Sequence, residues 1–132
     1  MLPWPGPPSC AGNTRTTPVS RAIRPPSGWQ KFRNQGLQKS TIATWLHKSG
    51  HQTGLFGKYM NNYAGRDIPL GWDRWYAWNS PHEGWTSLND RGTQRPRDAD
   101  SGMSNAALKF LDDRLDSPKP VFAFVNFTGT TP

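Results

Sequence analysis

The sequence predicts an α/β fold in which parallel strands are flanked by helices, preceded by an irregular N-terminal tail. Two stretches have helical spacing, and each is followed after a short connection by a strongly apolar stretch of strand length. The order helix–strand, long loop, helix–strand favours parallel strands, because each short connection returns the chain to the same sheet. Two strands are too few for a sheet covered on both faces, so we expect a fragment of a larger structure.

The tail is expected over residues 1–26, and one partial domain over residues 27–132. The tail holds seven of the 13 prolines and has almost no apolar periodicity. Residues 1–10 lack the basic start and apolar stretch of a signal peptide, and no apolar run is long enough to span a membrane. The one cysteine, Cys10, excludes an intrachain disulfide and any multi-cysteine zinc site.

The first helix is expected to begin at Ser40 or Thr41, both good N-caps, and to run to about residue 49. Its apolar face follows from helical spacing. This face consists of Ile42, Trp45, Leu46 and the small Ser49. Gly50 stands where a left-handed residue would end the helix. Residues 51–57 then indicate a short buried strand.

Residues 58–71 indicate a loop by their Asn, Gly and Pro content, and residues 79–99 indicate turns with little core material. Between them, residues 72–78 are rich in aromatic side chains. This stretch fits either a short strand or a packed loop. Its tryptophans at positions 72, 75 and 78 are expected to pack together rather than to form a binding platform.

The second helix is expected to begin at Asp100 or Ser101 and to end before Pro118. Its apolar residues recur at helical spacing. They are Met103, Ala107, Phe110, Leu111 and Leu115. Residues 121–127 are almost continuously apolar, which is typical of a strand covered on both faces.

The net charge of +7 is unevenly distributed along the chain. Residues 1–60 hold eight Lys and Arg and no acid, whereas residues 61–132 hold eight Lys and Arg and nine acids. A basic half with aromatic side chains would suit a nucleic-acid-binding module, which is one alternative function. No recognised nucleic-acid motif is present, so no nucleic-acid partner is expected. The other explanation is that part of this half is not a normal protein segment.

Lys58 is the candidate site residue, because it directly follows the first predicted strand. Ligands in α/β sheets bind at the carboxyl ends of strands, and residues 57–59 and 128–132 occupy such ends. A lysine there can bind an anion in a crevice, whereas the alternative is a solvated loop lysine. His47, His51 and His82 lack metal-ligand spacing. We therefore assign no metal site.

Residues 57–63 read Gly-Lys-Tyr-Met-Asn-Asn-Tyr, and residues 69–76 read Pro-Leu-Gly-Trp-Asp-Arg-Trp-Tyr. These two motifs resemble the sulfatase family, in the branch of N-acetylglucosamine-6-sulfatases and related arylsulfatases. The match is dense over residues 26–76 and weaker through the second helix and the last strand. The resemblance implies an alkaline-phosphatase-like α/β fold, with residues 27–132 as part of an N-terminal sulfatase domain. It also implies that the parent protein hydrolyses sulfate esters.

The resemblance implies a formylglycine nucleophile, made from cysteine in a Cys-x-Pro-Ser-Arg motif, and a calcium ion that helps to hold the sulfate. Lys58 matches the family's sulfate-binding lysine, and Asn61 follows the branch's pattern as a candidate substrate-binding residue. Met60 stands where other sulfatases carry histidine. Cys10 does not lie in the required motif, and no aspartate pair precedes the lysine. We therefore expect this chain alone to be inactive and assign neither calcium nor formylglycine to its residues.

Residues 5–25 fit a shifted reading frame. Moving the frame back by one base permits the peptide Gln-Tyr-Ala-His-Asn-Thr from residues 12–17, which is similar to the stretch after the formylglycine cysteine in sulfatases. Such a shift would explain the missing acids and the many prolines. The alternatives are an ordinary tail or a non-functional gene remnant. The particular sulfate ester, the compartment and the oligomeric state stay open.

Overall fold

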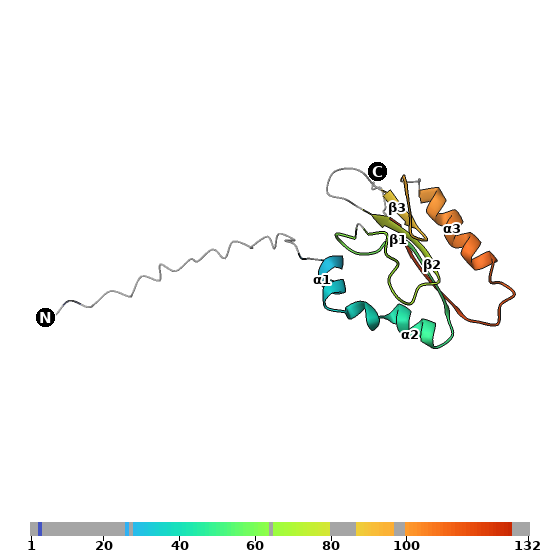
Figure 1. The fold of residues 1–132 in the computed structure, drawn as a ribbon, viewed down its shortest axis with the longest axis horizontal. Coiled ribbons are helices and arrows are strands. Elements are labelled where there is room, and N and C mark those ends of the chain that lie inside the picture. The colour runs from blue at the N-terminus through green and yellow to red at the C-terminus, as the bar shows by residue number, and fades with distance from the viewer. Residues whose placement is uncertain are drawn as a thin grey trace.

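The computed structural model describes residues 28–63, 65–79, 87–96 and 100–127, together with Pro3 and Pro26. Its elements follow one another along the chain (Figure 1). They are helix α1 (Trp29–Asn34), the 3-10 turn η1 (Leu37–Lys39), α2 (Ile42–Lys48), β1 (Gln52–Lys58), β2 (Arg74–Asn79), β3 (Ser87–Asp90), β4 (Thr93–Pro96), α3 (Asp100–Asp112) and β5 (Val121–Asn126). No helix in these ranges has the length and apolarity needed to cross a bilayer.

The strands form one mixed sheet in the order β4-β3-β2-β1-β5. The two predicted helix–strand units place β1 and β5 side by side in parallel, and β2 pairs in parallel with the other edge of β1. The expected α/β fold with parallel strands and flanking helices is therefore confirmed. Helix α3 lies on one side of the sheet, and α1 and α2 lie on the other (Figure 1).

The hairpin of β3 and β4 corrects the prediction that residues 79–99 hold only turns. These strands pair antiparallel with each other, and β3 pairs antiparallel with β2. A two-residue turn joins them, and Arg91 and Gly92 both have positive φ angles, of 54° and 87°. Strands of four residues are too short to show an alternating pattern, although Leu88 is buried in the core.

The start and end of α2 agree with the sequence, but its buried face does not. Thr41 caps the helix with a capping box, and Gly50 follows it with a φ of 91°. The predicted apolar face is wrong, because Ile42 and Trp45 are 57% and 59% exposed whereas Ala43 and Thr44 are buried. Any Cβ on Gly71 would overlap the backbone of Ala43 and Thr44, so the small residues form the contact face.

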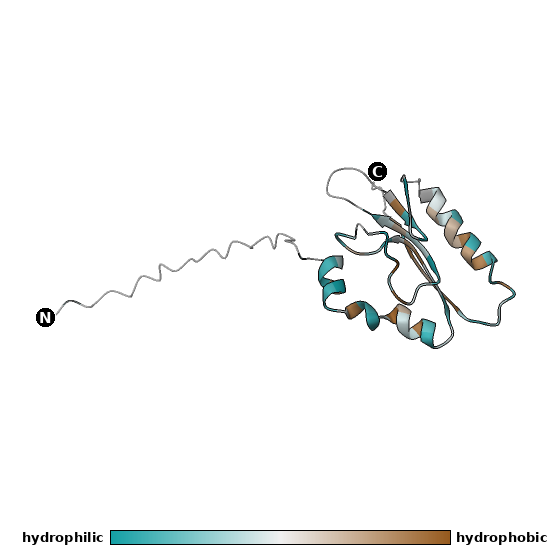
Figure 2. Ribbon diagram, in the orientation of Figure 1, coloured by the Kyte–Doolittle hydropathy of each residue, from teal (hydrophilic) through white to brown (hydrophobic). Residues whose placement is uncertain are grey.

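The structure confirms helix α3 and strand β5, but fewer of their side chains are buried than the sequence predicts. Met103, Ala107 and Phe110 pack against the sheet, whereas Leu111, in the last turn of the helix, is 40% exposed and Leu115, beyond the helix end at Asp112, is 76% exposed. Strand β5 is not covered on both faces. It forms an edge of the described sheet, and half of its side chains are exposed. Figure 2 shows the apolar segments, in brown, along α3 and within the strands.

Two hydrophobic clusters lie on the opposite faces of β1, because successive strand side chains alternate. Phe56 belongs to the cluster under α3, and Leu55 belongs to the cluster under α1. Trp75 joins the α1 cluster and contacts Trp72, whereas Trp78 packs against the α3 cluster. The three tryptophans therefore do not pack together as one cluster. Trp75 and Trp78 are three residues apart in β2, and this odd spacing places them on opposite faces of the sheet.

Strand β1 ends at a backbone contact that only glycine allows. Gly57 has a φ of 122°, and a Cβ there would overlap the Asn126 carbonyl oxygen of β5. We predict that Gly57→Ala lowers the free energy of unfolding by about 3 kcal/mol or more, because backbone strain adds to overpacking. Urea denaturation followed by tryptophan fluorescence measures this change.

The matched control is Gly50→Ala, at a φ of 91° with open space around the Cβ position. It is expected to lower the free energy of unfolding by only about 1 kcal/mol, from backbone strain alone. Equal losses in the two variants would contradict the contact between Gly57 and β5.

Candidate functional site

The candidate site lies at the carboxyl edge of the parallel strands, where β1 ends between β2 and β5. Lys58 pairs in register with Trp78 of β2, and its neighbour Gly57 pairs with Asn126 of β5. The Asn126 side-chain amide donates a hydrogen bond to the Lys58 carbonyl oxygen over 3.2 Å. The backbone of Lys58 is thus fixed on both sides at the end of the central parallel strand.

The Lys58 side chain is half-buried at this edge of the sheet. Its ammonium forms no hydrogen bond or ion pair with any residue in the described ranges. Arg33 and Asp67, by contrast, form an ion pair with each other. A positive charge held at a strand end without an internal partner is suited to bind an external anion.

The segment that follows Lys58 is held by an aromatic cluster. The Tyr59 ring lies 5.6 Å from that of Trp29, 5.7 Å from that of Tyr63 and 5.0 Å from that of Trp75, all in edge-on geometry. Burial, with a smaller contribution from Tyr63, raises the pKa of Tyr59 to about 12. The packing anchors the chain directly after the lysine.

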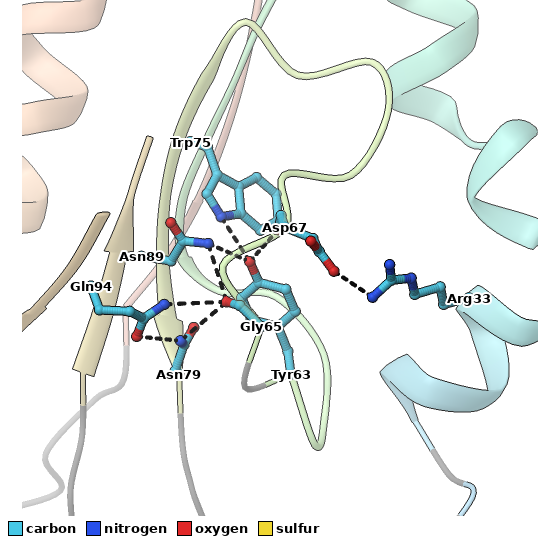
Figure 3. Close-up of polar contacts among 8 residues, drawn as sticks. All are labelled: Arg33, Tyr63, Gly65, Asp67, Trp75, Asn79, Asn89 and Gln94. Atoms are coloured by element: carbon cyan, nitrogen blue, oxygen red, sulfur yellow. Dashed lines mark hydrogen bonds and ion pairs between the residues drawn. The ribbon is translucent and has the colours of Figure 1, made fainter. Parts of the chain in front are cut away.

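The Tyr63 hydroxyl uses all of its hydrogen-bonding capacity (Figure 3). It accepts from Trp75 Nε1 over 3.2 Å and from Asn89 Nδ2 over 2.7 Å, and it donates to the Asp67 carbonyl oxygen. The Asp67 carboxylate in turn forms an ion pair with Arg33 of α1. Burial raises the pKa of Tyr63, so the hydroxyl keeps the proton that it donates.

Three side-chain amides converge on the carbonyl oxygen of Gly65 (Figure 3). Asn79 of β2, Asn89 of β3 and Gln94 of β4 donate to it over 3.4, 3.2 and 3.3 Å. Sequence reasoning missed these positioning residues, because two of them lie in the hairpin that was predicted as turns. Asn79, which directly follows the aromatic-rich residues 72–78, is the one local signal.

Asn61, the second predicted site residue, lies three positions after Lys58 on the same segment. It is exposed, and its carbonyl oxygen accepts the Trp29 backbone N–H over 3.0 Å. The following residue, Asn62, has a positive φ of 58°, which marks a tight turn. The segment therefore presents Asn61 to solvent on a backbone that is tied to α1.

The residues in the described ranges do not supply a calcium site. No group of three His, Cys, Asp or Glu side chains gathers among them. Asp67 is paired with Arg33, and Asp73 is paired with His47 over 3.0 Å near the amino ends of the strands. Cys10, His82 and residues 128–132 lie outside the part of the chain that the structure describes. No step can be assigned here to calcium or formylglycine.

We predict that Tyr63→Phe lowers the free energy of unfolding by about 1–3 kcal/mol, because Trp75 Nε1 loses its partner and Asn89 loses one of its acceptors. Chemical denaturation measures the loss. Tyr59→Phe is the matched control in the same cluster, since the Tyr59 hydroxyl has no hydrogen-bond partner among the described residues. A larger loss from the Tyr59 variant would contradict the role of the Tyr63 hydroxyl.

Alkaline pH is expected to destabilise the same cluster. The fold favours the neutral form of Tyr59, whose pKa is raised from 10.0 to about 12, whereas the unfolded chain ionises near the lower value. The free energy of unfolding should therefore fall as pH rises from about 10 to about 12. Denaturation at several pH values, with tyrosinate absorbance, checks this slope. If the free energy of unfolding falls as steeply with pH in Tyr59→Phe as in the unchanged chain, groups other than Tyr59 cause the fall.

Comparison with known proteins relates this chain to sulfatases. It is 34% identical over 95 residues to the extracellular sulfatase Sulf-1 homologue of Caenorhabditis elegans, covering 66% of this chain and 13% of that protein. It is 54% identical over 98 residues to the Sulf-1 homologue of Drosophila melanogaster, covering 66% and 9%. It is 29% identical over 112 residues to the N-acetylglucosamine-6-sulfatase of Capra hircus, covering 74% and 19%.

No family model and no solved structure matches the chain. The matches cover about two thirds to three quarters of this chain but only 9% to 19% of the length of these three relatives. The similarity extends over two different types of sulfatase and three animals. This chain therefore contains a segment of the sulfatase family.

Proposed function

We propose that residues 27–132 form part of the N-terminal domain of an alkaline-phosphatase-like sulfatase, and that Lys58 binds the sulfate group of the substrate there. The complete protein would hydrolyse sulfate esters. The observation that carries the proposal is the position of Lys58, a cation without a partner in the described part of the chain, at the carboxyl end of the central parallel strand in a sulfatase-related segment.

The chemistry suits an ester sulfate. Its negative charge is spread over three oxygens, so a single lysine ammonium can bind it without the bidentate geometry of an arginine guanidinium. Lys58 is half-buried, so the interaction is screened less than it would be on an open surface. Asn61 would add an uncharged polar contact from the same segment.

The hydrogen bonds around Tyr63 and Gly65 support this role by fixing the segment before a ligand arrives. The segment is attached to α1 through Asp67 and to the β2–β4 strands through Gly65. A binding group on a fixed backbone loses less conformational entropy when it binds. The chain's own contribution is therefore to bind and orient the sulfate group.

We predict that an aryl sulfate shifts the backbone amide signals of Lys58, Tyr59 and Asn61 in a two-dimensional NMR titration of the whole chain. Lys58→Ala should weaken binding about tenfold or more, since a hydrogen bond to a charged group is worth about 1.5–3 kcal/mol. The control Lys48→Ala removes an exposed lysine at the end of α2 and should leave binding unchanged.

The purified chain should not release the phenol from the same aryl sulfate, because its one cysteine is not in a Cys-x-Pro-Ser-Arg motif. If Lys58→Ala and Lys48→Ala weaken aryl sulfate binding equally, the binding is general charge attraction and not a specific site at Lys58. Phenol release that survives Lys58→Ala would overturn the assignment of this lysine to the site.

A further inference from the structure

Strand β5 lies at one lateral edge of the sheet and differs from β4, the strand at the other edge. In the described part of the chain, β5 pairs with β1 alone. Strand β4 has four residues and includes Arg95 and Pro96, and both a charge and a proline discourage a further strand from pairing. Strand β5 has six residues, and none of them is charged, glycine or proline. Its outer edge is therefore open to pairing with another strand.

The backbone groups of β5 alternate between β1 and this outer edge. Gln52 of β1 donates its N–H to the Pro120 carbonyl oxygen over 2.9 Å, and its register partner in β5 is Val121. Bonding groups alternate along a parallel ladder, so every second residue of β5, starting at Phe122, directs its N–H and C=O to β1. The outward-pointing N–H and C=O groups belong to Val121, Ala123 and Val125.

The sequence of β5 is the same when it is read in either direction. Residues 121–125 are Val-Phe-Ala-Phe-Val, centred on Ala123. Antiparallel pairing of two copies about a twofold axis at Ala123 places like residues opposite each other. Val121 then lies opposite Val125 of the second copy, and Phe122 lies opposite Phe124. The outward backbone groups are the ones that this register pairs, because Ala123 exchanges both of its hydrogen bonds with its own counterpart.

The same register also matches the two faces of the sheet. Phe122 and Phe124 line a cavity with Ile42 on the α2 side, whereas Ala123 packs against the cluster under α3. A twofold axis perpendicular to the sheet keeps each face on its own side. Aromatic rings therefore meet aromatic rings on the α2 side, and valines meet valines on the α3 side, which are favourable cross-strand pairs. Phe124 is 45% exposed in the single chain, so pairing removes apolar surface from water.

We propose that two copies of this chain form a dimer by antiparallel pairing of β5 with β5, which joins their two sheets into one. Each copy has one such edge among its described strands, so the assembly closes at two copies. Lys119 is the cation nearest to this edge in sequence, and the register places it opposite Phe127 of the second copy rather than opposite its own counterpart. The dimer does not depend on sulfate binding at Lys58.

The first test is sedimentation equilibrium of the whole chain over a range of protein concentrations, with amide hydrogen exchange measured by NMR on the same samples. We expect a monomer–dimer equilibrium without larger species. As the concentration rises, the amides of Val121, Ala123 and Val125 should exchange more slowly, whereas those of Phe122 and Phe124, already bonded to β1, should change little. A monomer at every concentration, larger assemblies, or a dimer without this alternation would overturn the proposal.

A pair of charge variants tests the register. Val121 and Val125 are 36% and 40% exposed in the single chain, so both positions should accept charged residues without loss of the fold, as circular dichroism will check. Val121→Lys/Val125→Lys places like charges opposite each other and should weaken the dimer at least about tenfold relative to Val121→Lys/Val125→Glu, which places opposite charges there. Equal dimer affinities in these two variants would contradict the pairing of β5 with itself.

A third variant controls for the added charge. Ile68→Lys/Leu70→Lys introduces two lysines at exposed positions in the loop before β2, away from β5 in sequence, and should leave the dimer unchanged. If it weakens the dimer as much as Val121→Lys/Val125→Lys does, net charge and not the β5 edge controls association.

Discussion

The fold depends on the central strand β1, which is buried on both faces and paired along both edges. Leu55 and Phe56 are almost inaccessible to solvent and belong to clusters on opposite faces, so β1 connects the two halves of the core. Its last buried residue, Gly57, lies against the β5 backbone too closely for any side chain. That contact fixes where the strand ends. Lys58 is therefore placed by the packing of the sheet rather than by its own interactions.

The segment after β1 is irregular, yet it is held as firmly as a regular element. Tyr63 packs in the aromatic cluster and satisfies its hydroxyl completely, while the Gly65 carbonyl accepts from three strands. Gly65 is half-buried, and three amide donors satisfy its carbonyl oxygen where water reaches it less freely. The hairpin of β3 and β4 thereby contributes to the candidate site without lying near it in sequence. Its structural role is to supply amide groups that position the loop.

The two edges of the parallel strands carry cations in different chemical settings. At the carboxyl edge, Lys58 has no partner among the residues that the structure describes. At the amino edge, Arg114 lies over the Phe110 ring and borders a cavity whose only described carboxylate is engaged with His47. The resemblance of residues 57–63 to a sulfatase motif bears on the first edge.

Sequence by itself determined the order of the main elements, the caps of α2, the parallel pairing of the two helix–strand units and the position of Lys58 at a strand end. These features follow from local chemistry and from periodicity, which a single segment carries within itself. Only the tertiary structure decided that Ala43 and Thr44 face the core instead of Ile42 and Trp45, since the close backbone of Gly71 excludes large side chains. It also decided the β3–β4 hairpin and the amide contacts to Gly65. Such contacts join residues 14 to 29 positions apart, and no local pattern encodes which distant donors a loop carbonyl will meet.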